Sequence, residues 1–367
     1  MHTTRLLFIG GFLGAGKTTL LENISQRLRN QGHTVGLITN DQAPALVDTL
    51  FLAQNDQEVA EVSGSCFCCN FSGLISAIDH LHHTIKPTIV LAEPVGSCTD
   101  LSATIFQPLK QQLDRSFTLS PLSVVIDTRR LLDLFHNRAT DLHPDAAYIL
   151  GKQLEEADMI VVNKIDLIDV QQRATLQEYL KDTHPRSTCF FLSAKTGEGV
   201  QDWLDAACAS NDCGGHIVEV DYDKYAKGEA VLGWLNATLA LEGTATDWNH
   251  FAKVALSSLG NQLDAAGVNV GHIKLFLATE TEPAIVANLT GPQETLDVRG
   301  PQRVSTAAYL TLNARAELPP ADLEALVRQT LQTLCGSALN QTVIEWQSLR
   351  PGRPQPTYRY DHVVTPS

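Results

Sequence analysis

The sequence contains no apolar run that approaches the ~20 residues needed to cross a bilayer, so we expect no membrane-spanning segment. Basic residues are also scarce, since 27 Lys and Arg stand against 41 Asp and Glu and the formal net charge is −14. A protein with this charge is poorly suited to grip nucleic acid or an anionic membrane surface, and we expect neither as a partner. The absence of an internal repeat argues against a repeat architecture.

Cysteine is too sparse for a disulfide scaffold, with 8 residues in a chain of 367. Three of them crowd into Cys66-Phe67-Cys68-Cys69, where such near neighbours cannot easily pair with one another. Reduced thiols of this kind are typical of a cytoplasmic protein. The short apolar run 6–9 leads into a glycine-rich turn rather than a cleavage site, so we expect no signal peptide and a cytoplasmic location.

The length favours two domains, because one domain usually takes ~100–200 residues. In residues 1–210, short apolar runs alternate with amphipathic helical stretches, which predicts an α/β fold with the doubly wound, mostly parallel sheet of a P-loop NTPase. The runs expected to form strands are 6–9, 34–39, 88–92, 123–126, 159–162 and 189–192.

A different pattern follows residues 211–215, which are typical of a linker. Residues 211–367 are predicted to form a second, smaller α+β domain that resembles the split βαβ (ferredoxin-like) layout with an additional strand, followed by a proline-rich tail. The expected strands are 232–241, 272–278, 284–289, 308–314 and 342–346, and the expected helices are 248–266 and 319–334. Three tryptophans are expected to anchor its core: Trp234, Trp248 and Trp346.

The segment 11–18 matches the phosphate-binding pattern G-x-x-x-x-G-K-[ST] between an apolar run and a helical pattern. Its glycines allow successive N–H groups to form an anion-binding nest at a helix N-terminus. Lys17 can then reach the β- and γ-phosphates, and the Thr18 hydroxyl can bind Mg²⁺. The other residues predicted to bind phosphate are Gly11, Gly14, Ala15, Gly16 and Thr19.

An N-K-x-D motif at 163–166 follows the predicted strand 159–162, and this pattern is that of guanine-specific GTPases. The Asp166 carboxylate can accept hydrogen bonds from N1–H and the 2-amino group of guanine, whereas adenine would leave it unpaired. The order of the motifs therefore favours GTP, with ATP as the alternative. The residues expected to bind guanine are Asn163, Lys164 and Asp166, together with Ser193, Ala194 and Lys195 of a segment that resembles the S-A-K loop.

Residues 89–96 form an apolar run that ends in Glu93, with Gly96 three positions later. This fits a Walker-B element, in which Glu93 holds the hydration shell of Mg²⁺ and the Gly96 N–H senses the γ-phosphate. Asp41 follows the predicted strand 34–39, where a switch residue or Mg²⁺ ligand would sit. Catalysis is expected to be electrostatic, with Lys17, Thr18 and Glu93 as the catalytic residues.

Cys66, Cys68 and Cys69 offer three thiolates within four positions, which suits Zn²⁺ or another thiophilic ion. An incomplete ligand set fits a transfer site better than a closed structural site, although buried structural thiols remain an alternative. A fourth ligand must come from elsewhere, and the candidates near in sequence are Asp41, Glu58, Glu61, His80, His82 and His83.

The order of P-loop, Cys-x-Cys-Cys, Walker B and N-K-x-D over residues 5 to about 208 resembles the CobW-type (cobalamin-synthesis-protein) GTPases, relatives of the nickel-insertion GTPases. The run 153–158 also resembles that family. The resemblance implies a GTPase that delivers a metal such as zinc or cobalt, with a client metalloprotein as partner. Two places differ: Ser65 stands where the family usually has glycine, and 41–44 lack the glutamates that often follow its switch asparagine.

The sequence thus predicts a GTP-driven metallochaperone, or metal-insertion switch, whose metal affinity depends on the nucleotide. Two other functions remain open. One is a GTP-dependent regulator that docks a client through the second domain and whose cysteines are structural, so that the purified protein would contain no metal. The other is a P-loop phosphotransferase, which would need an acceptor pocket and usually an arginine-bearing lid.

Overall fold

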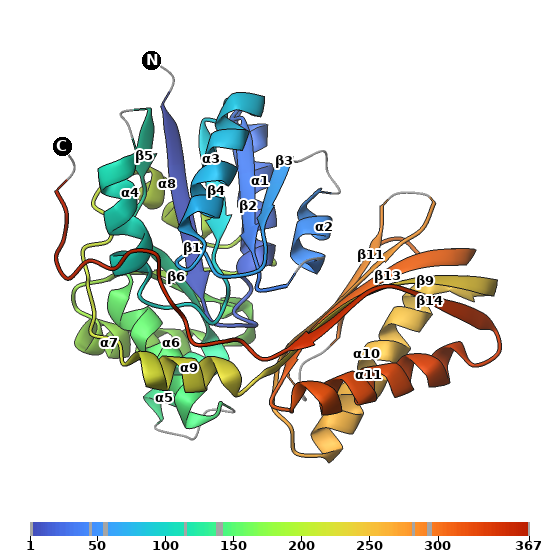
Figure 1. Cartoon of the computed structure of the whole chain (residues 1–367). Helices are drawn as coiled ribbons and strands as arrows, with labels where there is room; N and C mark the ends of the chain where they lie inside the picture. The colour runs from blue at the N-terminus through green and yellow to red at the C-terminus, as the bar shows by residue number, and fades with distance from the viewer. Residues whose placement is uncertain are drawn as a thin grey trace. The chain divides into compact units, whose positions relative to one another are not determined.

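The computed structural model describes residues 3–43, 46–53, 58–113, 116–136, 142–280, 283–291 and 296–365. The chain divides into two compact units, each with its own sheet (Figure 1). The first unit comprises Met1–Gln42, Gln57–Gly228 and Arg353–Ser367, and the second comprises Ala43–Asp56 and Glu229–Gly352.

A parallel sheet forms the centre of the first unit, in the order β3-β2-β4-β1-β6-β7-β8, with β5 also paired to β1. The strands are β1 (Thr4–Gly11), β2 (Val35–Asn40), β3 (Glu58–Val62), β4 (Ile89–Glu93), β5 (Phe117–Leu119), β6 (Ser123–Asp127), β7 (Met159–Asn163) and β8 (Thr188–Phe191). Strands β4, β6 and β7 are buried along their whole length, because both faces of the sheet are covered. The carboxyl ends of parallel strands meet at one edge, so the loops after β1, β2, β4 and β7 come together there.

Helices alternate with these strands along the chain. They are α1 (Lys17–Asn30), α3 (Phe71–Ile85), the π-helix η1 (Ser102–Phe106), α4 (Gln107–Gln112), α5 (Thr128–Phe135), α6 (Pro144–Glu156), the 3-10 turn η2 (Ile165–Leu167), α7 (Val170–Thr183), α8 (Val200–Ala209) and α9 (Tyr222–Ala230). The predicted doubly wound α/β class is therefore confirmed.

Two strands of this sheet have no counterpart among the predicted runs. Strand β3 lies at the edge of the sheet, and most of its residues are at least partly exposed. Strand β5 contains three residues and pairs only with the first residues of β1. Short or half-exposed strands lack the continuous apolar run by which a buried parallel strand is recognised.

An antiparallel sheet of 6 strands forms the second unit, in the order β12-β11-β10-β13-β9-β14. The strands are β9 (Gly233–Asp247), β10 (Val270–Ala278), β11 (Ile285–Leu289), β12 (Asp297–Arg299), β13 (Val304–Ala316) and β14 (Leu339–Leu349). Helix α10 (Trp248–Ala265) follows β9, and α11 (Pro320–Cys335) follows β13. The order β10-β13-β9-β14 with these helices is the split βαβ arrangement, which β11 and β12 extend at one edge. The predicted α+β class is therefore confirmed.

The core of the second unit lies between its sheet and the two long helices. Apolar residues of α10 and α11 pack against alternate residues of β9, β10 and β13. Trp248 is fully buried in this core, as expected. Trp234 is also fully buried but does not belong to this core, and the Arg315 guanidinium lies 4.1 Å from its ring centroid. Trp346 is only partly buried, because it lies on edge strand β14, where the Arg328 guanidinium stacks 3.7 Å from its ring centroid. Burial of such rings contributes several kcal/mol, since Trp→Ala in a core typically costs ~3–5 kcal/mol.

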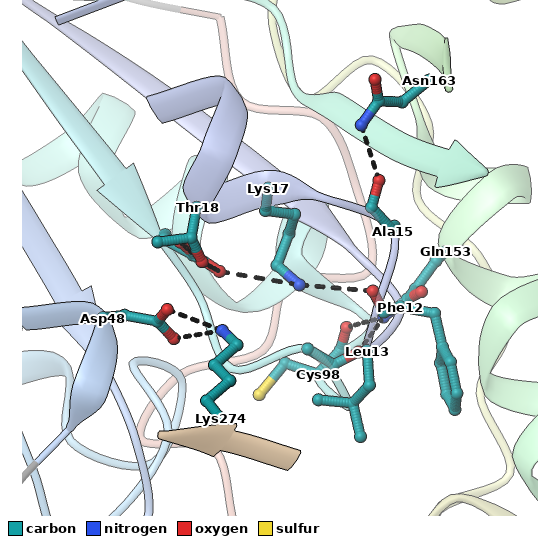
Figure 2. Close-up of polar contacts among 12 residues, drawn as sticks. Phe12, Leu13, Ala15, Lys17, Thr18, Asp48, Cys98, Gln153, Asn163 and Lys274 are labelled. Atoms are coloured by element: carbon teal, nitrogen blue, oxygen red, sulfur yellow. Dashed lines mark hydrogen bonds and ion pairs between the residues drawn. The ribbon is translucent and has the colours of Figure 1, made fainter. Parts of the chain in front are cut away.

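A short helix from the N-terminal half of the chain also belongs to the second unit. This helix, α2 (Val47–Ala53), packs its apolar side chains against residues of β10 and β11. Its Asp48 carboxylate accepts hydrogen bonds from Lys274 Nζ at 2.6 Å (Figure 2). The chain therefore leaves the first unit after Gln42 and returns to it at Gln57, between β2 and the cysteine motif.

The predicted domain boundary at 210/211 does not coincide with the compact units. Residues 211–228 lie in the first unit, where the N–H groups of Gly214 and Gly215 donate to the Asp158 carboxylate at 2.6 and 2.9 Å. The tail Arg353–Ser367 belongs to the first unit as well. Composition makes both segments resemble linkers, but hydrogen bonds to distant residues fix their backbones.

Helices α3, α10 and α11 are amphipathic, each with one buried stripe. No helix in the described ranges has both the length and the apolar character that a bilayer crossing requires.

Candidate nucleotide and metal site

The predicted phosphate-binding loop connects the carboxyl end of β1 to the start of α1. Gly16 has a left-handed φ of 91°, and a side chain at this position would collide with the amide of Asn163. Only glycine combines that conformation with so close an approach. The Ala15 N–H donates to the Phe12 carbonyl at 3.3 Å and closes the loop. A helix N-terminus reached through such a loop is a ready anion site.

The predicted catalytic residues lie together at this helix start (Figure 2). The Lys17 ammonium is 3.7 Å from a Glu93 carboxylate oxygen and donates to the Phe12 carbonyl at 3.3 Å. The Thr18 hydroxyl donates to Glu93 at 3.2 Å. A hydroxyl beside a carboxylate is the oxygen donor set that Mg²⁺ prefers, so these residues fit the ion that accompanies a nucleoside triphosphate.

Asn163 joins the predicted base-recognition motifs to the phosphate loop. Its Nδ2 donates to the Ala15 carbonyl at 2.8 Å (Figure 2). Its Oδ1 accepts from the Ala194 N–H at 2.9 Å. One buried amide therefore connects segments that are 148 positions apart along the chain.

The other residues expected to bind the base lie in the loops that follow β7 and β8. Lys164 has a left-handed φ of 66°, and its carbonyl accepts from the Thr128 hydroxyl at 3.2 Å. Asp166 lies in the 3-10 turn and is exposed, as a group that must reach a ligand would be. Ser193 is buried within its loop, whereas Lys195 is exposed.

Asn40 ties the carboxyl end of β2 to the cysteine motif. Its Nδ2 donates to the carbonyls of Val62 and Ser65 at 2.7 and 2.8 Å, and its Oδ1 accepts from the Phe67 N–H at 2.8 Å. The neighbouring Asp41 is buried. The strand end where switch residues are expected thus holds the cysteine loop in place.

The three clustered cysteines bring their sulfur atoms together. The Sγ atoms of Cys66 and Cys68 are 2.9 Å apart, those of Cys68 and Cys69 are 3.7 Å apart, and all three lie within 4.8 Å of one another. The N–H groups of Cys69 and Asn70 both donate to the Cys66 carbonyl and form the turn that gathers the thiols. Three sulfurs in this arrangement suit a thiophilic metal ion.

The three thiols differ in acidity. Hydrogen bonds from the thiols of Cys68, Cys69 and Cys98 lower the pKa of Cys66 well below its ordinary value. The same kind of contact, first of all with Cys66, raises the pKa of Cys68, and burial adds to that effect. The pKa of Cys69 is raised to about 11, chiefly by its hydrogen bond with Cys66. A metal that binds all three must therefore displace protons, so its affinity should rise with pH.

None of the carboxylates and imidazoles named as candidate fourth ligands joins this sulfur group in the part of the chain that the structure describes. Glu58 and His80 form an exposed pair 3.9 Å apart. A ring nitrogen of His82 lies 3.3 Å from the Thr4 hydroxyl, and His83 contacts a carbonyl of its own helix at 2.7 Å.

The C-terminal tail covers the cysteine loop. The Thr357 N–H donates to the Cys68 carbonyl at 2.8 Å, and the Gln355 N–H donates to the Cys69 sulfur at 3.2 Å. An N–H group that points at a sulfur stabilises its thiolate and tunes any metal bound there. The sequence predicts a proline-rich tail, but its place on the cysteine loop follows only from the fold.

Two side chains anchor the tail on the first unit. The Tyr358 ring packs edge-on against Phe71, with ring centroids 5.3 Å apart. The Arg359 guanidinium then forms an ion pair with the buried carboxylate of Asp100 at 2.7 Å. The segment over Cys69 is therefore held by an aromatic contact and, further along, by a charged one.

We expect Tyr358→Ala to loosen the tail, so that the Cys69 thiol becomes accessible to solvent more often. An edge-on aromatic pair contributes ~0.5–1.5 kcal/mol, so its loss should speed alkylation of Cys69 by iodoacetamide roughly 2- to 10-fold. Mass spectrometry of the modified peptide over time measures the rate. Tyr309→Ala, at an exposed tyrosine of β13, is the matched control. Equal Cys69 rates in the wild type and Tyr358→Ala would show that the tail does not protect this thiol.

Gln153 on α6 holds the loop that follows Glu93. Its Nε2 donates to the carbonyls of Gly96 and Cys98 at 3.0 and 2.7 Å (Figure 2). Gln153 belongs to none of the nucleotide-binding or cysteine motifs of the sequence. The signal was nevertheless present, because the run 153–158 is part of the family resemblance.

Arg130 on α5 contacts the phosphate loop from the other side. Its guanidinium donates to the Leu13 carbonyl and lies 5.3 Å from the centroid of the Phe12 ring. The Asp127 carboxylate accepts from the Arg130 N–H at 3.0 Å and thereby caps the helix. A lone arginine outside any motif gives no sequence signal, so only the fold identifies it as a positioning residue.

Glu156, also on α6, is a buried carboxyl behind the same loop. It accepts hydrogen bonds from the Thr99 hydroxyl at 2.8 Å and the Ser102 N–H at 2.9 Å. Burial raises the pKa of Glu156 to about 8, and the charge of nearby Asp100 adds to the shift. The side chain is therefore mostly protonated at neutral pH in the folded protein.

The free energy of unfolding should fall as the pH rises from about 5 to 8. The pKa of Glu156 is about 8 when folded against an ordinary 4.5, so the folded state keeps a proton that the unfolded state has lost. Glu156→Gln removes the carboxyl that titrates. Over this pH range the free energy of unfolding of the variant should therefore fall less than that of the wild type, by roughly 1–4 kcal/mol. Urea titrations across the range measure the effect. Glu155→Gln, at an exposed neighbour, is the control, and parallel profiles for wild type and Glu156→Gln would contradict the prediction.

The carboxyl edge of the first sheet is that of a P-loop nucleotide-binding protein, since a phosphate loop, a Walker-B carboxylate and a base-recognition motif converge there. Residues 5–191, half of the chain, match the family described as the CobW/HypB/UreG nucleotide-binding domain. The chain belongs to this family, which confirms the resemblance carried by its motifs.

Several named relatives share this domain. The "Zinc-regulated GTPase metalloprotein activator 1" of Dictyostelium discoideum is 24% identical over 210 residues, which cover 49% of this chain and 43% of that protein. The "Urease accessory protein UreG" of Metallosphaera sedula is 28% identical, over 53% of this chain and 88% of the relative. The "Zinc chaperone YjiA" of Escherichia coli is 25% identical, over 53% and 58%. The match thus spans less than two thirds of the first and third relatives, and the name of the first agrees with the expected GTPase class.

Solved structures are similar to a larger part of the chain. The Zn(II)-bound YjiA GTPase from E. coli is 16% identical, with 90% of this chain and 99% of that chain covered and a TM-score of 0.36. HypB from Helicobacter pylori in complex with nickel is 18% identical, with 55% and 83% covered and a TM-score of 0.40. Similarity at this level carries no information on function.

Proposed function

We propose that this protein is a GTP-hydrolysing metallochaperone. Its cargo is Zn²⁺, with Co²⁺ as the second candidate, held at Cys66, Cys68 and Cys69 and passed to a client metalloprotein. Zinc is favoured because two of the relatives carry zinc in their names and because thiolates suit it. Membership of a nucleotide-binding family supports the binding of GTP, and the sulfur cluster supports the binding of a metal.

The phosphate end of the nucleotide would be held by the loop 11–16 and the start of α1. Lys17 would neutralise charge on the γ-phosphate, and the Thr18 hydroxyl and Glu93 carboxylate would hold Mg²⁺ and its hydration shell. Mg²⁺, when bound, supplies positive charge to the β- and γ-phosphate oxygens. Intrinsic turnover is expected to be slow, below ~10⁻² s⁻¹, as in GTPases that lack an arginine supplied by a partner.

The base end would be selected by the loops after β7 and β8. Asp166 accepts hydrogen bonds from guanine, and Asn163 holds the Ala194 loop behind the base. Because Asn163 also donates to the phosphate loop, recognition of the base and placement of the phosphates depend on one another. The Asp166 carboxylate supports GTP over ATP, because adenine would leave it unpaired.

The observation that carries the coupling between nucleotide and metal is the side chain of Asn40. It bonds the carbonyls of Val62 and Ser65, which precede the cysteine motif, and the N–H of Phe67, which lies within it. Its neighbour Asp41 stands at the strand end where a triphosphate and its Mg²⁺ would order a switch. A displacement of this strand end therefore moves the cysteine loop, and by linkage a metal on that loop alters the affinity for nucleotide.

The test is the Zn²⁺ affinity of the full-length, reduced protein, measured by chelator competition with either a non-hydrolysable GTP analogue and Mg²⁺ or GDP. We expect tighter binding with the GTP analogue, by about 5- to 150-fold. The same titration with Co²⁺ compares the two candidate metals.

The cysteine-to-serine variant at 66, 68 and 69 should lose this binding. A variant with serine at Cys189, Cys208 and Cys213, which lie elsewhere in the first unit, is the matched control and should retain it. Equal affinities in the two nucleotide states, or full Zn²⁺ binding without the clustered thiols, would end the proposal.

A further inference from the structure

A fourth thiol lies against the sulfur cluster. Cys98 is in the loop that follows β4, and only 1% of its surface is exposed. Its thiol is near enough to those of Cys66 and Cys68 to lower the pKa of the first and raise the pKa of the second. Its sulfur does not, however, belong to the group of three that all lie within 4.8 Å of one another. These residues are about 30 positions away in sequence, outside the Cys-x-Cys-Cys motif, so no spacing rule connects Cys98 with it.

The backbone of Cys98 is fixed on both sides. Its N–H donates to the Val95 carbonyl at 2.9 Å, and its carbonyl accepts from Gln153 Nε2 at 2.7 Å (Figure 2). The next residue, Thr99, is bound in turn by the buried carboxyl of Glu156 at 2.8 Å. The position of the Cys98 thiol is therefore set by a loop whose backbone is hydrogen-bonded to α6.

The cluster itself lacks one ligand. Zn²⁺ in thiolate sites is nearly always four-coordinate and tetrahedral, and three cysteines leave one vertex. Among the described residues, no carboxylate, imidazole or further thiol shares the close sulfur group, so any fourth ligand, Cys98 included, must move in when the metal binds. We propose that Cys98 becomes the fourth ligand when the metal binds, so that the ion is held by three sulfurs of the Cys-x-Cys-Cys motif and one from the loop after β4. This inference rests on the proposed metallochaperone function.

Binding of this kind requires small movements of the thiols. In a tetrahedral site with Zn–S bonds of ~2.3 Å, the sulfurs stand ~3.8 Å apart. The Cys66 and Cys68 sulfurs, now 2.9 Å apart, must separate by roughly 1 Å to reach that spacing. Because the Cys98 sulfur lies outside the group of three, the loop 94–98 must also move toward these sulfurs.

A bond between the metal and Cys98 would couple the metal site to the nucleotide site. Cys98 lies two residues after Gly96, and a β-carbon at Gly96 would stand 3.1 Å from Lys17 Nζ. The loop that would supply the fourth sulfur is thus the loop that meets the phosphate-binding lysine. Metal on Cys98 holds Gly96 in one place, and a γ-phosphate that moves Gly96 changes the metal site.

X-ray absorption at the zinc K-edge tests the ligand set in the wild type, with no variant that could misfold. Full-length protein loaded with one equivalent of Zn²⁺ under reducing conditions should show four sulfurs at ~2.3 Å. Three sulfurs and one nitrogen or oxygen would overturn the assignment of Cys98.

A second test uses Co²⁺ as an optical probe, since the thiolate-to-cobalt charge-transfer absorption grows with the number of thiolates. Cys98→Ser should lose about a quarter of this absorption and bind Zn²⁺ at least ~10-fold more weakly. Cys213→Ser, another buried thiol of the first unit, should match the wild type. GTP-analogue binding by each variant checks that the nucleotide domain is folded.

The outcomes separate this inference from the proposed function. If Cys66→Ser loses metal and Cys98→Ser keeps the wild-type spectrum and affinity, Cys98 is not a ligand and the three-cysteine site stands. If neither substitution changes the Co²⁺ absorption or the Zn²⁺ affinity, the metallochaperone proposal is wrong, and so is the assignment of Cys98 as a ligand.

Discussion

Lys17→Ala is expected to slow GTP hydrolysis by about 10²- to 10³-fold, the usual cost of removing one group that stabilises transition-state charge. The Lys17 ammonium lies between the Phe12 carbonyl of the phosphate loop and the Glu93 carboxylate, where a γ-phosphate would replace the carboxylate as its partner. Phosphate release under single-turnover conditions measures the rate of the chemical step.

The control for this prediction is Lys181→Ala, which removes an exposed lysine from the last turn of α7 and should leave the rate unchanged. Because the ammonium also contacts the loop, thermal unfolding of both variants should be compared. Hydrolysis by Lys17→Ala at the wild-type rate would mean that the motif at 11–18 does not hold the reacting phosphate.

Asp166→Asn is expected to weaken GTP binding by at least ~100-fold. A carboxylate accepts from both N1–H and the 2-amino group of guanine, whereas an amide offers one acceptor and places a donor against a donor. Xanthosine triphosphate carries an oxygen in place of the 2-amino group, so the variant should bind it better than GTP. Fluorescence titration with labelled nucleotides gives all the dissociation constants.

Asp182→Asn, at an exposed position near the end of α7, serves as the control and should bind GTP like the wild type. The wild type should in turn prefer GTP to ATP by a similar factor. Equal binding of GTP and ATP by the wild type would remove the basis for calling N-K-x-D a guanine site.

The two substitutions report on separate parts of one nucleotide. Lys17 acts where charge develops, so its loss should appear in the rate at saturating GTP. Asp166 binds the base equally in the ground and transition states, so its loss should appear mainly in affinity. A slower chemical step in Asp166→Asn would indicate that the Asn163 amide transmits a disturbance from the base site to the phosphate loop, since it bonds both loops.

Much of the first unit could be predicted because its signals are local. The strands of a covered parallel sheet are short apolar runs, and the phosphate loop needs glycines at fixed positions for its backbone conformation. The six predicted runs of this half all correspond to observed strands. Even the ferredoxin-like class of the second unit followed from the order of its strands and helices.

The surroundings of the cysteines could not be predicted in the same way. Asn40, Cys98 and the tail from Gln355 onward all reach the cysteine loop from other parts of the chain. Their contacts depend on which loops meet at one edge of the sheet, a property of topology rather than of spacing. Helix α2 shows the same limit, because its 7 residues reveal nothing of their partner Lys274, 226 positions away.

The sequence by itself determined the chemistry that this protein can hold: a phosphate loop with Lys17 and Thr18, a guanine motif ending in Asp166, and three thiols within four positions. Side-chain type and short-range spacing are enough to specify these groups, because each motif is built from neighbouring residues. Only the tertiary structure decided which of them act on one another. It placed Asn40 on the backbone of the cysteine loop and Cys98 near the thiols, because these loops follow strands that are neighbours in the sheet.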